Sequence, residues 1–163
     1  MHLRNEIPVS VSSKRAWEVM GEEFGNIGLW VASLESSHLV GDLGVGAHRV
    51  CNGLGFGPFP PSIVKEKLVH FDPQKREFSY ELTEGNPWFI THARNNWTIT
   101  SVDENNSIIK AHAVVDIIWF MRPLAWVLPA LLKKQLALFT EELSYFIESG
   151  NIHPRKQQVL GNT

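Results

Sequence analysis

The residues best suited to acid–base chemistry are a carboxylate and a phenol that lie in largely apolar segments. Glu66 lies within SIVKEKLVHF and Tyr80 within REFSYELTE, two segments in which apolar and polar residues alternate. A carboxylate buried among apolar residues is costly unless it is paired or hydrogen-bonded. A carboxylate whose pKa is raised in this way can act as a general base. A neighbouring phenol or guanidinium can polarise a carbonyl, which aldol-type cyclisation requires. These segments therefore allow a reaction with Glu66 as the catalytic base, but they do not require one.

A second feature of chemical interest is the glycine-rich loop NGLGFGPFPP at residues 52–61. A phosphate-binding loop leads its glycines into the N-terminus of a helix, usually with Lys and Ser or Thr following. Here Gly53, Gly55 and Gly57 run into prolines and then into a strand pattern. The sequence therefore excludes a nucleotide loop and leaves two alternatives open, a mobile gate or a rigid plug.

The thiol and imidazole groups have no catalytic or metal-binding spacing. Cys51 is the single cysteine, so we expect no internal disulfide and a reducing compartment. It lacks the sequence signature of a nucleophile and is interpreted as a small apolar core residue. The seven histidines never fall at the helical spacing of metal ligands. We therefore predict no metal site and no cofactor.

Composition and charge restrict the class of protein. The chain has 163 residues, of which 44% are hydrophobic and 20% charged, and its net charge is −2, as expected for one globular domain. This charge gives no electrostatic case for binding nucleic acid. The N-terminus lacks an apolar signal region, and the apolar stretch 117–132 is too short and too interrupted to span a membrane. We predict a cytoplasmic protein, monomeric or homodimeric, with membrane-surface contact as an alternative.

Hydrophobic periodicity predicts the elements that position these groups. An alternating segment at 7–13 predicts a strand, and a helix over 14–25 follows it, capped by Ser12 or Ser13. A short helical turn is expected at 26–31. Five further strand patterns are separated by turn signals, at 46–52, 62–71, 76–84, 91–100 and 107–118.

The chain closes with a long helix that has one apolar face. Leucines and phenylalanines recur at three- and four-residue steps over 124–147. Pro129 is expected to kink this helix or to restart it, with a short helix over 123–127 before it. Residues 151–163 are interpreted as a flexible tail, which places a single domain over 1–150. An antiparallel meander of about six or seven strands can bury one face by wrapping around the helix.

In the order and spacing of these elements the chain resembles the helix-grip superfamily (SRPBCC), which includes START domains, the birch-pollen allergen family and polyketide cyclase/dehydrase-like proteins. The resembling segments are IPVSVSSKRAWEVMGEEFGNIGLW, GVGAHRV and VKEKLVHFDPQKREFSYEL. The resemblance implies an α+β fold in which a curved antiparallel sheet wraps around the C-terminal helix. It also implies two short helices between the first two strands and a cavity for a hydrophobic ligand. It implies no single reaction, because this fold hosts carriers, receptors and cyclases.

Strand alternation and this resemblance together assign side chains to the cavity. Glu66 and Tyr80 face inward by both criteria, and Arg49 and Cys51 by the resemblance. Arg49 and Glu66 carry opposite charges on neighbouring strands, so they either orient the polar end of a ligand or only tie the two strands together. The predicted ligand-binding residues are Arg49, Cys51, Glu66, Tyr80, Asn95, Trp97, Phe56, Phe59, Leu132, Leu136 and Phe139.

Three functions stay open at this point. The first is a carrier or sensor that binds a small hydrophobic or aromatic ligand, such as a lipid or a polyketide. The second is a cyclase or dehydratase with Glu66 as general base. The third is a module that docks on a protein or membrane through Leu124, Trp126, Val127 and Leu128. The plant hormone receptors of the superfamily use the connection that corresponds to 53–61 as a gate, which makes Phe56 and Phe59 the groups that would cover a ligand.

Overall fold

A curved antiparallel sheet holds one long helix against its concave face. The computed structural model describes residues 1–55, 59–119 and 128–161. Within these residues the helices are α1 (Ser13–Trp17), α2 (Leu128–Ser149) and α3 (Pro154–Gly161), with a π-helix η1 (Glu18–Glu22) and a 3₁₀-helix η2 (Phe24–Leu29). The strands are β1 (His2–Val9), β2 (Leu34–Val40), β3 (His48–Gly53), β4 (Ser62–Asp72), β5 (Glu77–Glu84), β6 (Ile90–Ser101) and β7 (Ser107–Ile117). The predicted α+β helix-grip arrangement is confirmed.

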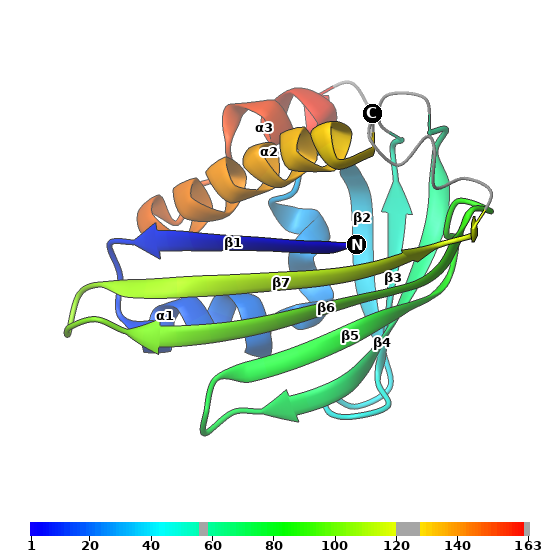
Figure 1. The fold of residues 1–163 in the computed structure, drawn as a ribbon. Coiled ribbons are helices and arrows are strands. Elements are labelled where there is room, and N and C mark those ends of the chain that lie inside the picture. Colours follow the sequence, from blue (N-terminus) through cyan, green and yellow to red (C-terminus); the bar gives the residue numbers. More distant parts are fainter. Residues whose placement is uncertain (56–58, 120–127, 162–163) are drawn as a thin grey trace.

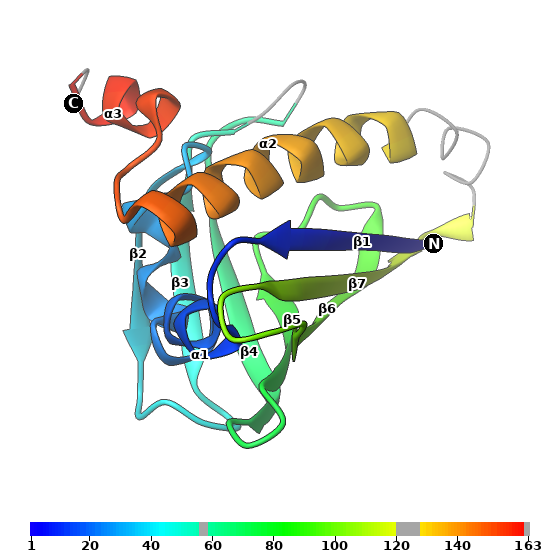
Figure 2. The ribbon, with the colours of Figure 1, turned by 90° about the vertical axis from the view of Figure 1, so that its left-hand side faces the viewer.

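The seven strands form one sheet in the order β1-β7-β6-β5-β4-β3-β2. Consecutive strands from β2 to β7 pair antiparallel as a meander, while β1 pairs with β7, where Ile7 lies opposite Ile109. Figure 2 shows α2 across the concave side of this sheet and α1 where the chain leaves β1. The sheet therefore curves toward the side on which α2 and the helices between β1 and β2 lie (Figure 1). The sequence analysis did not identify β2, because few of its residues are apolar.

The segment between β1 and β2 is helical, but not as one regular helix over 14–25. Ser12 caps α1 as predicted, its Oγ accepting a hydrogen bond from the Arg15 N–H at 3.2 Å. The helix then widens into η1 and tightens into η2. A Cβ on Gly28 would collide with the backbone of Ser36 and Ser37. Glycine therefore lets η2 lie directly against β2, an approach that no other residue permits.

Helix α2 begins at Leu128, which places Pro129 in its first turn. Of the two expectations for Pro129, this position agrees with a helix that starts there and not with a kink, because a first-turn proline lacks only an N–H that would have no partner within the helix. Asn5 of β1 donates to the Thr140 hydroxyl of α2 at 2.9 Å and so ties the helix to the edge of the sheet. The predicted short helix at 123–127 lies outside the described residues.

The last part of the chain differs from the loose tail expected at 151–163, because residues 154–161 form α3. Lys156 is fully buried, and its Nζ donates to the backbone carbonyls of Leu34 and Glu35. Arg155 donates from Nε to Glu142 at 2.9 Å. These partners lie far away in the sequence, so local composition could not reveal the docking of α3 beside β2 and α2. No helix among the described residues is long and apolar enough to cross a membrane.

Aromatic rings fill much of the space between the sheet and the helices. Trp97 on β6 lies 6.2 Å from Phe78 on β5 and 5.7 Å from Phe139 on α2, measured between ring centroids. Phe139 in turn lies 5.2 Å from Trp30. Buried aromatic pairs of this kind contribute packing energy beyond the area they bury. The core is therefore dense where α2 and Trp30 meet β5 and β6.

Candidate functional site

Arg49 and Glu66 form a buried ion pair on the concave face of the sheet. They are directly opposed in the pairing of β3 with β4, and both are buried. The Arg49 Nε lies 2.6 Å from the Glu66 Oε2, and its Nη2 lies 2.5 Å from the same oxygen. Residues directly opposed on an antiparallel pair share a face, which is why strand alternation places these two together.

The guanidinium of Arg49 is also held by η2. Its Nη1 donates to the Phe24 carbonyl at 2.8 Å, and its Cζ lies 4.0 Å from the Phe24 ring and 4.9 Å from the Tyr80 ring. Burial alone would lower the pKa of Arg49, but the Glu66 carboxylate outweighs it and the pKa is raised. Arg49 is thus a permanent cation that is held in place by Glu66, the Phe24 carbonyl and the faces of two neighbouring rings.

Cys51 and Tyr80 complete the polar surroundings of this pair as neutral groups. Burial, reinforced by the Glu66 carboxylate, raises the pKa of Cys51 to about 12. The protonated thiol lies 3.7 Å from the Glu66 Oε2. Burial is also the main reason that the pKa of the Tyr80 phenol is raised, with Glu66 adding to it and Arg49 opposing it. Neither group is therefore available as an anion at neutral pH, and Cys51 is not an activated nucleophile.

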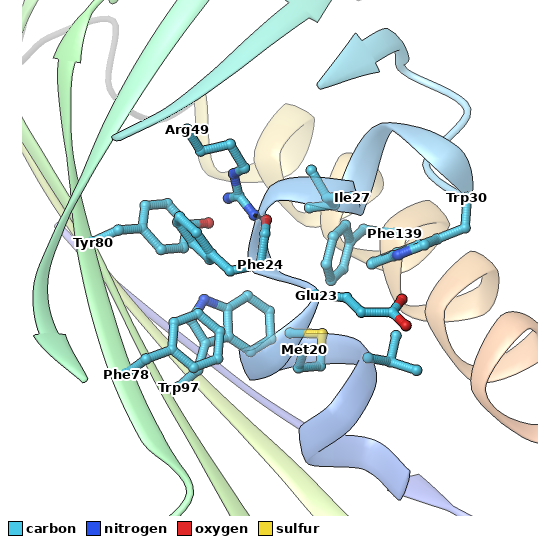
Figure 3. Close-up of a pocket in the computed structure, with 11 residues that line it drawn as sticks. Met20, Glu23, Phe24, Ile27, Trp30, Arg49, Phe78, Tyr80, Trp97 and Phe139 are labelled. Carbon is cyan, nitrogen blue, oxygen red and sulfur yellow. Dashed lines mark hydrogen bonds between the residues drawn. The ribbon is translucent and has the colours of Figure 1, made fainter. Parts of the chain in front are cut away.

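Next to Arg49 lies a cavity of about 10 Å³, close to the space of one water molecule. Figure 3 shows Tyr80, Phe78 and Trp97 on one side of it and Ile27, Trp30 and Phe139 on the other. The exposed carboxylate of Glu23 lies across the cavity from Arg49 (Figure 3). The full set of lining residues is Val19, Met20, Glu23, Phe24, Ile27, Trp30, Arg49, Phe78, Tyr80, Trp97 and Phe139.

One polar atom of this cavity is unsatisfied. Trp97 is 6% exposed, and its Nε1 has no hydrogen-bond partner in the part of the chain that the structure describes. This N–H lies near the Tyr80 oxygen but outside ordinary hydrogen-bond geometry, and its influence opposes the rise of the Tyr80 pKa. Buried polar groups without a partner are uncommon in folded proteins. Trp97 therefore presents a donor toward the cavity.

The predicted site residues fall into three groups. Arg49, Tyr80, Trp97 and Phe139 line the cavity. Glu66 and Cys51 do not, because they contact each other beside Arg49 rather than the cavity itself. Three other predicted residues, Asn95, Leu132 and Leu136, are half-buried but do not line the cavity. The Phe59 ring lies 6.0 Å from the Phe89 ring, measured between centroids, and Phe56 falls outside the described residues.

The docking surface predicted at the start of the last helix also falls largely outside the described part of the chain. Leu124, Trp126 and Val127 are not described, and of Leu128 only the backbone is. The mobile gate and the rigid plug both stay predictions for the 53–61 loop, because part of this loop lies outside the described residues. Its described end is tight, since a Cβ on Gly55 would lie 2.6 Å from the Phe59 carbonyl oxygen.

Several lining residues were absent from the predicted site. Met20, Phe24, Ile27 and Trp30 come from η1, η2 and the residue after them. The apolar spacing of this segment marked its residues as core. Strand alternation carries no information about helices, so it could not show which of them face the cavity. The remaining residues missed are Val19, Glu23 and Phe78.

Comparison with known proteins agrees with this architecture. Norcoclaurine synthase from Thalictrum flavum, solved with dopamine and hydroxybenzaldehyde, superposes with a TM-score of 0.72 at 18% identity, covering 94% of this chain and 89% of that chain. A START superfamily protein from Mycobacterium smegmatis gives 0.75 at 11% identity, covering 92% and 99%. Ara h 8.0201 gives 0.73 at 14% identity, covering 93% and 99%. These similarities establish the fold alone.

A search of curated proteins finds no match to the sequence. A family model, however, matches residues 1–143, and its description is polyketide cyclase / dehydrase and lipid transport. The match includes both members of the Arg49–Glu66 pair and all the residues that line the cavity. The chain therefore belongs to the polyketide cyclase/dehydrase and lipid transport family, with the helix-grip fold of START proteins.

Proposed function

We propose that this protein binds a small hydrophobic or aromatic ligand between the sheet and α2, as a carrier or a sensor. The observation that supports it most is the buried Arg49–Glu66 pair, joined at 2.6 Å and set beside an aromatic cavity. If the pair served only to tie β3 to β4, two apolar side chains would do so without the cost of desolvating two charges. If the pair also orients the polar end of a ligand, its charged groups supply the hydrogen bonds that fix this orientation, which apolar side chains could not do.

A ligand of any size must move side chains, because the cavity as described holds about 10 Å³. Phe139 forms the part of the cavity wall that α2 provides, and its ring contacts Trp97 of the sheet and Trp30. Displacement of α2 from the sheet would therefore open the cavity toward its apolar side. Norcoclaurine synthase, which has the same fold, was solved with two small aromatic molecules, and this supports an aromatic ligand here.

Native mass spectrometry and thermal shift measurements test the proposal. We expect either a co-purified ligand mass or a rise in Tm with members of a panel of lipids, flavonoids and polyketide-like aromatics. Arg49→Met should lose that response. Lys65→Met is the matched control, since it removes a charge from the neighbouring strand at an ion pair that is exposed on the opposite face. A ligand-free mass together with an unchanged Tm across the whole panel would contradict binding.

A second candidate, from the same family description, is a cyclase or dehydratase with Glu66 as general base. Its support is that the hydrogen bonds from the described residues to this carboxylate all go to Oε2, and a general base needs an oxygen that other groups do not occupy. Arg49, not Glu66, lines the cavity, so a substrate would have to reach past the guanidinium. Glu66→Gln separates the two functions: kept binding with lost turnover supports a base, and lost binding supports an anchor.

A further inference from the structure

We infer that the small cavity beside Trp97 and Tyr80 is a recognition site for one neutral acceptor oxygen of the ligand, such as the carbonyl of an aromatic ketone or quinone. The inference rests on the proposed ligand-binding function. It adds the chemical class of the polar group that the ligand carries. It also assigns the selection of that group to Trp97 and Tyr80 rather than to Glu66.

The first argument is the unsatisfied indole of Trp97. The residue is 94% buried, and its Nε1 has no hydrogen-bond partner among the described residues. An indole N–H donates and never accepts. Since buried donors in folded proteins are nearly always paired, the group that completes this site must be an acceptor.

The second argument is that the polar groups on the Trp97 side of the cavity, Arg49 and Tyr80, can also donate, whereas the Glu23 carboxylate lies on the far side (Figure 3). The guanidinium of Arg49 has five N–H donors. One from Nε and one from Nη2 point to Glu66, and one from Nη1 points to the Phe24 carbonyl. Two N–H donors of the guanidinium therefore have no bond to these groups. The Tyr80 phenol keeps its proton because burial raises its pKa. Figure 3 shows the Trp97 nitrogen on the edge of the indole that faces Tyr80 and Arg49. These donors therefore converge on one part of the cavity.

The third argument is charge. Glu66 already balances Arg49 at 2.6 Å, so the pair as a whole is neutral. A ligand carboxylate placed here would be a buried anion without a counter-charge, which is costly. A ligand ammonium would meet the donors of Trp97 and Arg49. The exposed carboxylate of Glu23 lies across the cavity, away from them. A neutral oxygen is the group that satisfies these donors without adding charge.

The fourth argument is size. A cavity of about 10 Å³ has room for one oxygen atom, whether that of a ligand or that of a water that takes its place. The rest of the ligand must then lie against the rings that surround this point. Phe24, Phe78 and Phe139 all line the cavity, and flat aromatic surfaces of this kind favour a planar ligand.

A matched series of four probes tests the inference: fluorene, 9-fluorenone, fluorene-9-carboxylate and 9-aminofluorene. They share one ring system and differ in the group at one carbon. Because two hydrogen bonds distinguish them, we expect 9-fluorenone to bind about tenfold or more tighter than fluorene, by isothermal titration. We expect the carboxylate and the amine to bind more weakly than the ketone. In Trp97→Phe and Tyr80→Phe the ketone should lose most of this advantage, while the affinity for fluorene stays the same.

A spectroscopic readout keeps the test independent of the variants' folding. The indole ¹H–¹⁵N resonance of Trp97 in the wild-type protein, assigned by its loss in Trp97→Phe or by site-specific labelling, should move downfield with 9-fluorenone and not with fluorene. Trp119→Phe is the control variant, because that side chain is 76% exposed and lies outside the cavity wall. Its affinity for the ketone should equal that of the wild type.

Each other outcome is decisive. Equal binding of fluorene and 9-fluorenone overturns the inference and leaves the proposed function standing. Tightest binding of the carboxylate or the amine overturns the neutral-oxygen assignment. An unmoved Trp97 resonance under saturating ketone means that the cavity holds water only, which also overturns it. Binding of none of the four probes contradicts the proposed function for aromatic ligands, and the inference fails with it.

Discussion

The Arg49 Nε of β3 donates to the Glu66 Oε2 of β4 across 2.6 Å, with both side chains buried on the concave face of the sheet. The same guanidinium donates to the Phe24 carbonyl of η2. This single cation therefore connects two strands, the 3₁₀-helix and the wall of the cavity. Its removal should affect both the stability of the fold and the binding of a ligand.

The first prediction concerns the stability of this pair. Arg49→Met leaves the Glu66 carboxylate buried without its cation, which we expect to lower the free energy of unfolding by about 3–5 kcal/mol. The double variant Arg49→Met/Glu66→Leu should regain much of this loss, since it buries no charge. Urea unfolding measures both. Lys65→Met, which removes an exposed ion pair on β4, should cost no more than about 1 kcal/mol. A single variant as stable as the wild type would contradict this account of the pair.

The second prediction concerns the pH dependence that Cys51 produces. Burial raises the pKa of its thiol to about 12 in the folded protein, whereas the unfolded chain has a thiol pKa of about 8.5. The folded state therefore holds this proton more tightly. Its stabilising contribution is complete below the unfolded pKa and is lost as pH rises toward the folded one. The loss should approach about 1.4 kcal/mol per pH unit within that window.

Urea unfolding of the wild type and Cys51→Ala on both sides of the ordinary thiol pKa checks this slope. The difference between the two proteins isolates Cys51 from other groups that titrate at alkaline pH, notably Tyr80. A maleimide should also modify native Cys51 far more slowly than the urea-unfolded chain, because the thiol is buried. Rapid native labelling, or parallel pH profiles of the two proteins, would rule out the protected thiol.

The third prediction concerns the docking of α3. Arg155 donates to Glu142, which is 3% exposed and also accepts the Ala32 N–H at 3.0 Å. Arg155→Ala leaves this carboxylate short of one partner, and we expect a loss of about 1–3 kcal/mol in the free energy of unfolding. Glu142→Gln in the same background should restore part of it. Arg155→Ala should also increase hydrogen exchange over α3. A variant with unchanged exchange there would show that α3 is held by other contacts.

The fourth prediction concerns the close approach of η2 to β2. Gly28→Ala places a Cβ against the backbone of Ser36 and Ser37, which cannot move as a flexible side chain would. We expect a loss of about 1–3 kcal/mol from this overpacking, measured as a fall in Tm. Gly161→Ala is the control, because an added Cβ there meets no atom within 4 Å. Equal Tm values for the two variants would mean that η2 can lift from β2 without cost.

The sequence by itself determined the parts of this protein that depend on local periodicity. Two-residue alternation placed Glu66, Tyr80 and Trp97 on one face of the sheet, because successive side chains of a strand point to opposite faces whatever the neighbouring strand is. The helix cap could be narrowed to Ser12 or Ser13, because a capping hydrogen bond is local, and in the structure Ser12 accepts it from Arg15. The order of strands and helices then indicated the helix-grip fold, which the structure and the family match confirm.

Only the tertiary structure decided what surrounds those side chains. Phe24 reaches Arg49 from a different element, 25 residues away along the chain, and no local pattern encodes that contact. Lys156 is buried because carbonyls of Leu34 and Glu35 lie beside it, more than a hundred residues away. The volume of the cavity depends on how closely rings from η2, β5, β6 and α2 approach one another. Such packing is a property of the assembled core, so the sequence could name the faces of the site but not its size or its unsatisfied donor.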